Sequence, residues 1–247
     1  MPEPRLDPSI AKEQRAWGST ESLDYYRHHR QRVEDLYPSE RFFLPDVVRQ
    51  SASMLDVGCA AGGFSAVVRA FHPGIRYLGV DVAPALVAAA RADHPDAEFV
   101  VGDGVHFATP PGSFELAHAS GVLHVNGRFR EIISAMWQQT SRFLLCDLRL
   151  NSGTGERGHM VSPFGEPEEV TLPYIVLNTE EALDIFKRLQ PAPRSLRVKG
   201  YPQRASDAAR LANPDVLMAF FLVEKARAGD TCPGDAQPYV DIDLHVR

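Results

Sequence analysis

The chain has 247 residues, a net charge of −6, 44% hydrophobic residues and 23% charged residues. This length fits one large α/β domain. The acidic balance argues against duplex or RNA partners, which need a basic surface. No apolar run approaches the roughly 20 residues that a membrane span requires, and the acidic N-terminus does not resemble a signal peptide. We therefore predict a cytoplasmic protein with neither a nucleic-acid nor a membrane partner.

Cysteine usage agrees with this location. The three cysteines, Cys59, Cys146 and Cys232, are scattered and odd in number, which indicates reduced thiols. No Cys/His spacing is typical of a zinc site, so no metal is expected.

The first 50 residues are predicted to be an N-terminal helical segment. Residues 1–18 are expected to be loosely ordered. A helix is expected from Glu21, because apolar and aromatic residues recur at steps of three and four up to Tyr37 and Pro38 can end it. A short element over 41–50 then leads into the first strand.

The most informative stretch is 54–65, where an apolar run ends in Asp56 and continues into a glycine-rich turn and a helix. Glycines allow positive φ and close approach of a ligand to the backbone, and a helix N-terminus offers free N–H groups. The order Gly58, Ala60, Gly62 lacks the middle glycine of the dinucleotide fingerprint. An acid at the mouth of the turn repels a pyrophosphate and suits an ammonium or sulfonium group.

Two further predicted strands also end in acids. The strand over 77–81 ends in Asp81, and the strand over 97–101 is followed by Asp103 and Gly104. A carboxylate at the second strand tip can accept both ribose hydroxyls. A fourth strand from Phe114 is followed by a helix over 129–137 and a buried strand over 142–148.

Together these motifs, over 52–126, resemble class I S-adenosylmethionine (SAM)-dependent methyltransferases. The family's turn reads Asp-x-Gly-x-Gly/Ala-x-Gly, and its fourth strand is often followed by Gly-Val-Leu-His-His, where this chain has Val125 in place of the second histidine. The resemblance implies a doubly wound, mostly parallel α/β sheet of seven strands with the last antiparallel, helices on both faces and SAM as cofactor. It implies a contact with the methionine part for Asp56, Gly58, Ala60 and Gly62, with the ribose for Asp81, and with the adenine edge for Asp103 and Gly104. Val82 and Ser120 complete the expected cofactor-binding set.

The rest of the chain is expected to complete that domain. A helix should start at Asn178 with Glu181 three residues later, and the apolar run over 216–223 is typical of a central buried strand. Residues 151–177 are too long for a simple connection; they can form a substrate lid or wall, or else a dimer contact or a β-hairpin arm. The predicted organisation is a helical lid over 1–50, a SAM-binding domain over 51–226 with its insertion at 151–177, and a tail over 227–247.

Few residues need to be catalytic, because methyl transfer from a sulfonium is an in-line displacement on an activated carbon. His124 is the candidate base, with a packing role as the alternative. Tyr25 and Tyr26 on the N-terminal helix, and Asp147 and Arg149 at the end of the fifth strand, are candidate substrate contacts. Arg27 or Arg30 can bind the methionine carboxylate, although a solvated helix face is the simpler interpretation for either.

The predicted function is SAM-dependent transfer of a methyl group to an O or N atom, or a C atom, of a small metabolite. A non-catalytic SAM-binding partner protein is the main alternative. A NAD-binding oxidoreductase is disfavoured by Ala60 in the turn and by the absence of a Tyr-x-x-x-Lys pair. A homodimer is compatible with the sequence but is not indicated by it.

Overall fold

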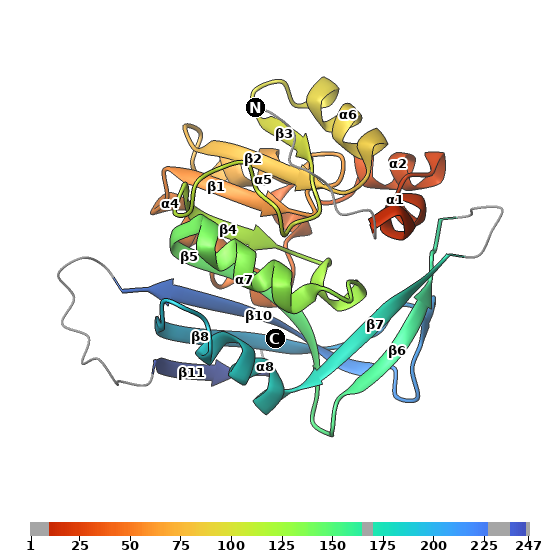
Figure 1. The fold of residues 1–247 in the computed structure, drawn as a ribbon, viewed down its shortest axis with the longest axis vertical. Coiled ribbons are helices and arrows are strands. Elements are labelled where there is room, and N and C mark those ends of the chain that lie inside the picture. Colours follow the sequence, from red (N-terminus) through yellow and green to blue (C-terminus); the bar gives the residue numbers. More distant parts are fainter. Residues whose placement is uncertain (1–9, 165–169, 227–237, 246–247) are drawn as a thin grey trace.

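The computed structural model describes residues 10–164, 170–226 and 238–245. A central sheet with strand order β11-β8-β10-β5-β4-β1-β2-β3 crosses the molecule, and β6, β7 and β9 extend it beyond β5 (Figure 1). The strands are β1 (Ser53–Val57), β2 (Arg76–Asp81), β3 (Glu98–Val101), β4 (Phe114–Ala119), β5 (Thr140–Asn151), β6 (Glu156–Val161), β7 (Thr171–Asn178), β8 (Pro193–Arg204), β9 (Ala209–Arg210), β10 (Asp215–Lys225) and β11 (Tyr239–Asp243).

The helices cover both faces of this sheet, as expected for a doubly wound fold. Apolar residues of α7 and α8 pack on one face, and those of α4, α5 and α6 pack on the other. The helices are α1 (Ala11–Trp17), α2 (Thr20–Arg27), α3 (Pro38–Arg41), α4 (Leu44–Arg49), α5 (Phe64–Phe71), α6 (Pro84–Asp93), α7 (Phe129–Gln139) and α8 (Thr179–Lys187), with short 3₁₀ turns η2 (Val33–Asp35) and η3 (Leu123–Val125).

The predicted α/β fold class is confirmed, and the strand count is larger than expected. Strands β3, β2, β1, β4 and β5 pair in parallel, β10 is antiparallel to both β5 and β8, and these seven strands form the predicted sheet. Among the described residues the sheet has eleven strands, because β6, β7, β9 and β11 add to it. Strand β10 lies between two neighbours, which explains why the run over 216–223 is apolar throughout.

The N-terminal segment differs from its prediction. The single helix expected from Glu21 to Tyr37 is broken, since α2 ends at Arg27 and Arg30 adopts a left-handed backbone conformation with φ 53°. Pro38 begins α3 at its first turn, where its fixed φ is favourable. Part of the stretch expected to be loosely ordered forms α1, while residues 1–9 lie outside the described residues.

The insertion over 151–177 contains a β-hairpin. Strand β6 pairs antiparallel with β7, and β7 pairs in parallel with the end of β5. The hairpin arm was one of the expected alternatives. In the predicted tail, β11 pairs in parallel with β8, so its described part is an edge strand, while 227–237 and Cys232 lie outside the described residues.

The alternation of side chains along the strands places polar groups on one side of the sheet. Leu144, Cys146 and Leu148 of β5 face the α7 and α8 side, so the odd-numbered Asp147 and Arg149 face the opposite side. The same alternation directs Asp56 of β1 and His118 of β4 to that opposite side, and the N-terminal segment covers it.

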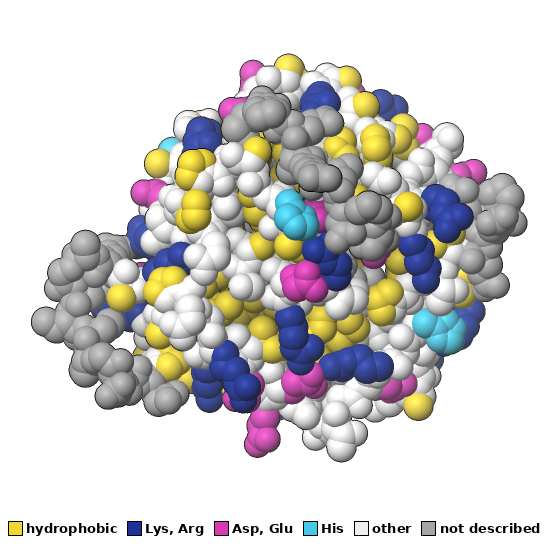
Figure 2. All heavy atoms as spheres, in the orientation of Figure 1, with side chains coloured by type: hydrophobic (Ala, Val, Ile, Leu, Met, Phe, Trp, Pro, Cys, Tyr) yellow, Lys and Arg dark blue, Asp and Glu magenta, His cyan; other side chains and the backbone are white. Residues whose placement is uncertain are grey.

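No helix in the described ranges is long and apolar enough to cross a membrane. On the face that carries α7 and α8, Lys and Arg side chains are interspersed with Asp and Glu side chains (Figure 2).

Candidate active site

A pocket of about 530 Å³ lies where the carboxyl ends of the strands meet the N-terminal segment and the hairpin. Small-molecule sites commonly have a volume in this range. Open α/β sheets bind ligands at the carboxyl ends of their strands, so the fold itself predicts a site in this position. The pocket is lined by several of the predicted site residues, namely Tyr25, Tyr26, Asp56, Gly58, Ala60, Asp81, Ser120, His124 and Arg149.

The turn after β1 has the backbone that a ligand cradle requires. Gly58 has φ 81° and Ala60 has φ 47°, both in the left-handed region. A Cβ on Gly58 would lie 2.1 Å from Val122 Cγ2. Gly62, with φ 82°, packs against the Phe99 ring and does not line the pocket, so its role is to let the turn approach β3.

The Gly58 turn gives a stability prediction with a built-in control. Gly112 has a similar φ of 74° and no heavy atom within 4 Å of an added Cβ. Gly112→Ala should therefore cost only the left-handed strain, about 1–2 kcal/mol of unfolding free energy, whereas Gly58→Ala adds the clash with Val122. We expect urea unfolding to show a clearly larger loss for Gly58→Ala; equal losses would contradict the close contact.

Asp81 is arranged to accept further hydrogen bonds. Its Oδ1 accepts from the Ala83 N–H at 2.9 Å and its Oδ2 accepts from the Ala60 N–H at 2.9 Å. Each carboxylate oxygen has a second lone pair, so two hydroxyls can still be accepted. Burial raises the pKa of Asp81 to about 6, and the backbone hydrogen bonds only partly oppose that rise.

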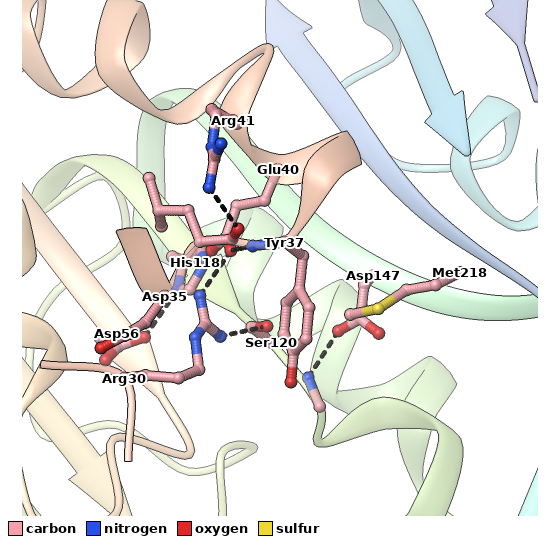
Figure 3. A network of polar contacts seen from close by, with 12 residues as sticks. Arg30, Asp35, Tyr37, Glu40, Arg41, Asp56, His118, Ser120, Asp147 and Met218 are labelled. Atoms are coloured by element: carbon pink, nitrogen blue, oxygen red, sulfur yellow. Dashed lines mark hydrogen bonds and ion pairs between the residues drawn. The ribbon is translucent and has the colours of Figure 1, made fainter. Parts of the chain in front are cut away.

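Asp56 does not stand free at the mouth of the turn. Its Oδ2 accepts from the Tyr77 hydroxyl, and its Oδ1 lies 2.7 Å from His118 Nδ1. His118 Nε2 lies 3.1 Å from Glu40 Oε1, and Glu40 Oε2 pairs with Arg30 Nη2 at 2.5 Å (Figure 3). Asp56 was expected to attract a cationic group of the ligand, but its negative charge is largely balanced by His118.

This buried chain of charges is balanced. Burial lowers the pKa of His118, but its hydrogen bonds and charge interactions with Asp56 and Glu40 outweigh burial and raise the pKa to about 9. Glu40 has a lowered pKa: burial opposes this, and the Arg30 charge and the His118 hydrogen bond overcome it. Two carboxylates thus alternate with two cations, as a buried ion cluster requires.

The buried position of Arg30 is the feature of the site that the sequence predicted least well. Its guanidinium stacks on the rings of Tyr37 and Phe64, each 4.7 Å away, and its Nη1 donates to Ser120 Oγ at 2.5 Å. Its Nε is buried without a hydrogen-bond partner. The expectation of a solvated helix face is wrong for Arg30, because the chain turns inward at its left-handed backbone. Arg27 is indeed partly exposed and pairs with Asp93.

The His118 chain predicts an alkaline loss of stability. The pKa is raised above the unfolded value, so the stabilisation is fully present below about pH 6.5 and is lost as pH rises through about 9. We expect the free energy of unfolding to fall between pH 7 and 10, by an amount on the order of a few kcal/mol. His118→Gln should be less stable at pH 7 and should lack this slope; an unchanged slope would contradict the charged state of His118.

Other predicted cofactor residues lie outside the pocket lining. The Asp103 carboxylate accepts from the N–H groups of Val105 and His106 at 2.9 Å each, and it lies 2.8 Å from His106 Nδ1. It also pairs with Arg128. Gly104, with φ 74°, forms the turn beside it. The Val82 carbonyl accepts from Gln14. Their contacts with an adenine stay predictions.

His124 lies in the pocket wall with an unusual environment. It is 8% exposed, its ring meets the Tyr174 ring edge-on at 5.0 Å, and its Nδ1 is buried without a partner. Burial first, and the nearby Arg149 charge second, hold its pKa well below the usual value. His124 is therefore a neutral imidazole at pH 7.

Asp147 and Arg149 form a buried ion pair beside His124. Asp147 also accepts the Gly121 N–H at 2.6 Å, and only Arg149 of the two lines the pocket. Residues that sequence reasoning missed also line this end of the pocket. They are Tyr37, Met160, Phe164, Tyr174, Gln203 and Arg204.

Tyr25 and Tyr26 reach the pocket from α2. Tyr26 packs with Trp17 of α1, and both tyrosines pack with Phe164, which follows β6; the Phe164 ring lies 5.4 Å from Tyr25 and 5.6 Å from Tyr26. Ser162 Oγ also donates to the Ala16 carbonyl at 2.9 Å. The N-terminal helices and the hairpin thus meet at the pocket, and described residues of the 151–177 insertion form part of its lining.

Comparison with known families agrees with this architecture. Residues 54–144 match the family model described as "Methyltransferase domain". The central part of the chain thus resembles a methyltransferase domain. The matched range runs from β1 to β5 and so contains the glycine turn, Asp81 and His124.

Two curated relatives match over short stretches. Trans-aconitate 2-methyltransferase of Paracidovorax citrulli is 30% identical over 88 residues, which is 35% of this chain and 34% of the relative. The protein of the same name from Methylobacterium radiotolerans is 33% identical over 69 residues, which is 28% of this chain and 26% of the relative. The aligned part spans about a third or less of these relatives' length.

Solved structures share the fold at low sequence identity. A SAM-dependent methyltransferase from Methanosarcina mazei superposes with a TM-score of 0.56 at 15% identity, covering 77% of this chain and 98% of that one. The [4+2]-cyclase SpnF gives a TM-score of 0.57 at 14% identity, covering 91% and 98%. The sugar N-methyltransferase KedS8 from a Streptoalloteichus species gives 0.53 at 15% identity, covering 85% and 94%.

Proposed function

We propose that this protein transfers a methyl group from SAM to an oxygen or nitrogen atom, or to a carbon atom, of a small molecule. The observation that carries the proposal is that one pocket joins the predicted cofactor cradle, with Asp81 and the Gly58 turn, to a neutral histidine with an unpartnered ring nitrogen. A ligand that fills the cradle would point its reactive end toward that histidine.

The residues fit the cofactor on several counts. The spare lone pairs of Asp81 suit two ribose hydroxyls, and the turn with left-handed backbone at Gly58 and Ala60 lines the same pocket. Arg30, held by Glu40 beside Ser120, is placed to bind the methionine carboxylate. When bound, SAM supplies a methyl group that its sulfonium activates for displacement.

The chain's own residues would align the acceptor and remove a proton. Alignment in a closed pocket supplies much of the rate of such a reaction. His124 can take the acceptor proton on a ring nitrogen, because it is neutral and neither nitrogen is bonded to another described residue. Tyr25 and Tyr26, together with Phe164, would cover the pocket and exclude water, as the helical lid was predicted to do.

Known proteins of this fold leave one alternative open. The fold neighbour SpnF is named a [4+2]-cyclase, so this architecture is compatible with a non-methylating role. A non-catalytic SAM-binding protein is therefore kept as the second candidate. The names of the curated relatives and of KedS8 favour a small-molecule acceptor. A cytoplasmic location, the lack of a nucleic-acid partner and a homodimer stay predictions.

A labelling experiment tests the proposal. The purified protein is incubated with methyl-labelled SAM and a deproteinised metabolite extract, and label in small molecules is compared with that of the Asp81→Asn variant. We expect labelled product with the wild type only. Tight SAM binding with no labelled product in extracts from several growth conditions would favour the non-catalytic candidate.

A further inference from the structure

The acceptor end of the pocket contains an arginine whose donors are mostly unused. Arg149 is 6% exposed, lines the pocket, and makes one hydrogen bond to the described residues, from Nη1 to Asp147 Oδ2. A guanidinium has five N–H donors. The donors that do not face Asp147 have no hydrogen-bond partner among the described residues, so they remain for a ligand.

The ion pair holds this arginine in a fixed position. Asp147 is fully buried, and its other oxygen accepts the Gly121 N–H at 2.6 Å. Because both carboxylate oxygens of Asp147 are engaged, Arg149 cannot swing away without leaving a buried charge unpaired, which is costly. Such a pre-organised fork suits the planar, two-oxygen geometry of a carboxylate.

A second cation lines the same pocket. Arg204, at the end of β8, lines the pocket and is exposed, and it has no ion-pair partner among the described residues. The other charges near this end are compensated, since Arg30 pairs with Glu40 and Arg149 pairs with Asp147. Arg204 is thus the arginine of the described pocket lining without an ion pair, and Glu13 is a lining carboxylate whose Oε2 is buried without a hydrogen-bond partner.

The neutral histidine lies beside this cationic group. Arg149 is close enough to His124 to contribute to its lowered pKa. A weakly basic imidazole is better matched to an acidic hydroxyl, such as a phenol or an enol, than to an aliphatic alcohol or a protonated amine. The two features together describe an acceptor with an oxyanion at one end and an acidic hydroxyl at the other.

We infer that the methyl acceptor is a small hydroxy acid whose carboxylate binds Arg149 and Arg204 while its hydroxyl lies against His124. This inference rests on the proposed function and specifies its substrate class. In the reaction the hydroxyl oxygen forms a bond to the methyl carbon as the carbon–sulfur bond breaks. The hydroxyl proton passes to a His124 nitrogen and then to solvent, and the thioether leaves neutral.

Calorimetry on the S-adenosylhomocysteine-loaded protein tests this assignment. The probes are 2-, 3- and 4-hydroxybenzoate, their three primary amides, and tyramine. We expect at least one hydroxybenzoate to bind about ten- to hundred-fold more tightly than its amide, which is the factor that charge-assisted hydrogen bonds supply. Equal binding of acid and amide, preference for tyramine, or no binding of any acid would overturn the inference.

The variants separate recognition from folding. Arg204→Gln is an exposed change, and Asp147→Asn with Arg149→Gln removes both buried charges together, so neither leaves an unpaired buried charge. Each should weaken the hydroxybenzoate by about tenfold or more while S-adenosylhomocysteine still binds. Arg188→Gln, on the exposed end of α8, is the matched control and should change nothing. If S-adenosylhomocysteine itself fails to bind the wild type, the proposed function fails; if it binds and the acids do not, only the hydroxy acid assignment fails.

Discussion

His124→Ala should lower single-turnover methyl transfer by roughly 10²–10⁴-fold, the usual contribution of a positioned general base. The physical reason is that an acceptor hydroxyl must lose its proton near the transition state, and His124 is the described histidine of the pocket lining that has a buried ring nitrogen without a hydrogen-bond partner. The measurement is the single-turnover rate at saturating SAM with the acceptor identified by labelling. Affinity for S-adenosylhomocysteine should stay nearly unchanged.

The matched control for His124 is Tyr174→Phe. This change keeps the ring that meets His124 edge-on at 5.0 Å and removes only the hydroxyl. If His124 only packs against Tyr174, His124→Ala should lower the melting temperature and leave the rate of the folded fraction within about threefold of wild type, well below a catalytic contribution. That outcome would remove His124 from the reaction and leave alignment as the source of the rate.

The pH dependence of the reaction gives a second readout on His124. Its pKa lies well below 6.5, because burial disfavours the charged ring and Arg149 repels it. The base therefore stays unprotonated as pH falls from 8 through 6.5, and the rate at saturating SAM should show no inflection near 6.5. An inflection at that pH, absent in His124→Ala, would show a histidine that titrates normally and would contradict the buried environment.

Asp81→Asn should weaken binding of S-adenosylhomocysteine by roughly a hundredfold or more. The carboxylate is expected to accept two ribose hydroxyls, and each charge-assisted hydrogen bond contributes about 1.5–3 kcal/mol. The asparagine variant keeps an acceptor oxygen for only one of the two backbone N–H groups, those of Ala60 and Ala83, so its folding is checked by circular dichroism. Asp93→Asn, at the end of α6, is the control acid and should bind normally.

The raised pKa of Asp81 predicts how the affinity for S-adenosylhomocysteine changes with pH. Its pKa is raised to about 6 by burial. Ionised Asp81 accepts the hydroxyls and protonated Asp81 does not accept them as well, so affinity should decline as pH falls through about 6. Asp81→Asn should lose this dependence. If its affinity matched wild type at pH 8, Asp81 would serve only to cap α6.

The cofactor half of the site was readable from the sequence because its features are local. Gly58, Ala60 and Asp81 lie at strand ends that periodicity alone locates, and the structure places all three in one pocket. The seven strands of the expected sheet were found for the same reason. Apolar runs bounded by glycine, proline or acids are strong local signals.

The rest of the candidate site, around Arg30, Glu40 and His118, depends on contacts between segments that lie far apart in the sequence. Glu40 and His118 meet across 78 positions, and Arg30 and Ser120 across 90. Nothing in the spacing near Arg30 indicates its left-handed backbone, so the helix was extended through it. His118, a histidine in an otherwise apolar strand, was the one available signal of the buried charge chain. The hairpin at 151–177 was detectable as an insertion, but its pairing with β5 was not.

Titration with S-adenosylhomocysteine and with NAD tests the central claim most directly, because it asks which nucleotide the cradle after β1 accepts. Both ligands are titrated calorimetrically into the wild type and into Asp81→Asn at pH 8, where Asp81 is ionised. We predict saturable binding of S-adenosylhomocysteine to the wild type, strong weakening in the variant, and no comparable binding of NAD. Tighter binding of NAD than of S-adenosylhomocysteine, or binding that the variant leaves unchanged, would contradict the assignment of this pocket to SAM.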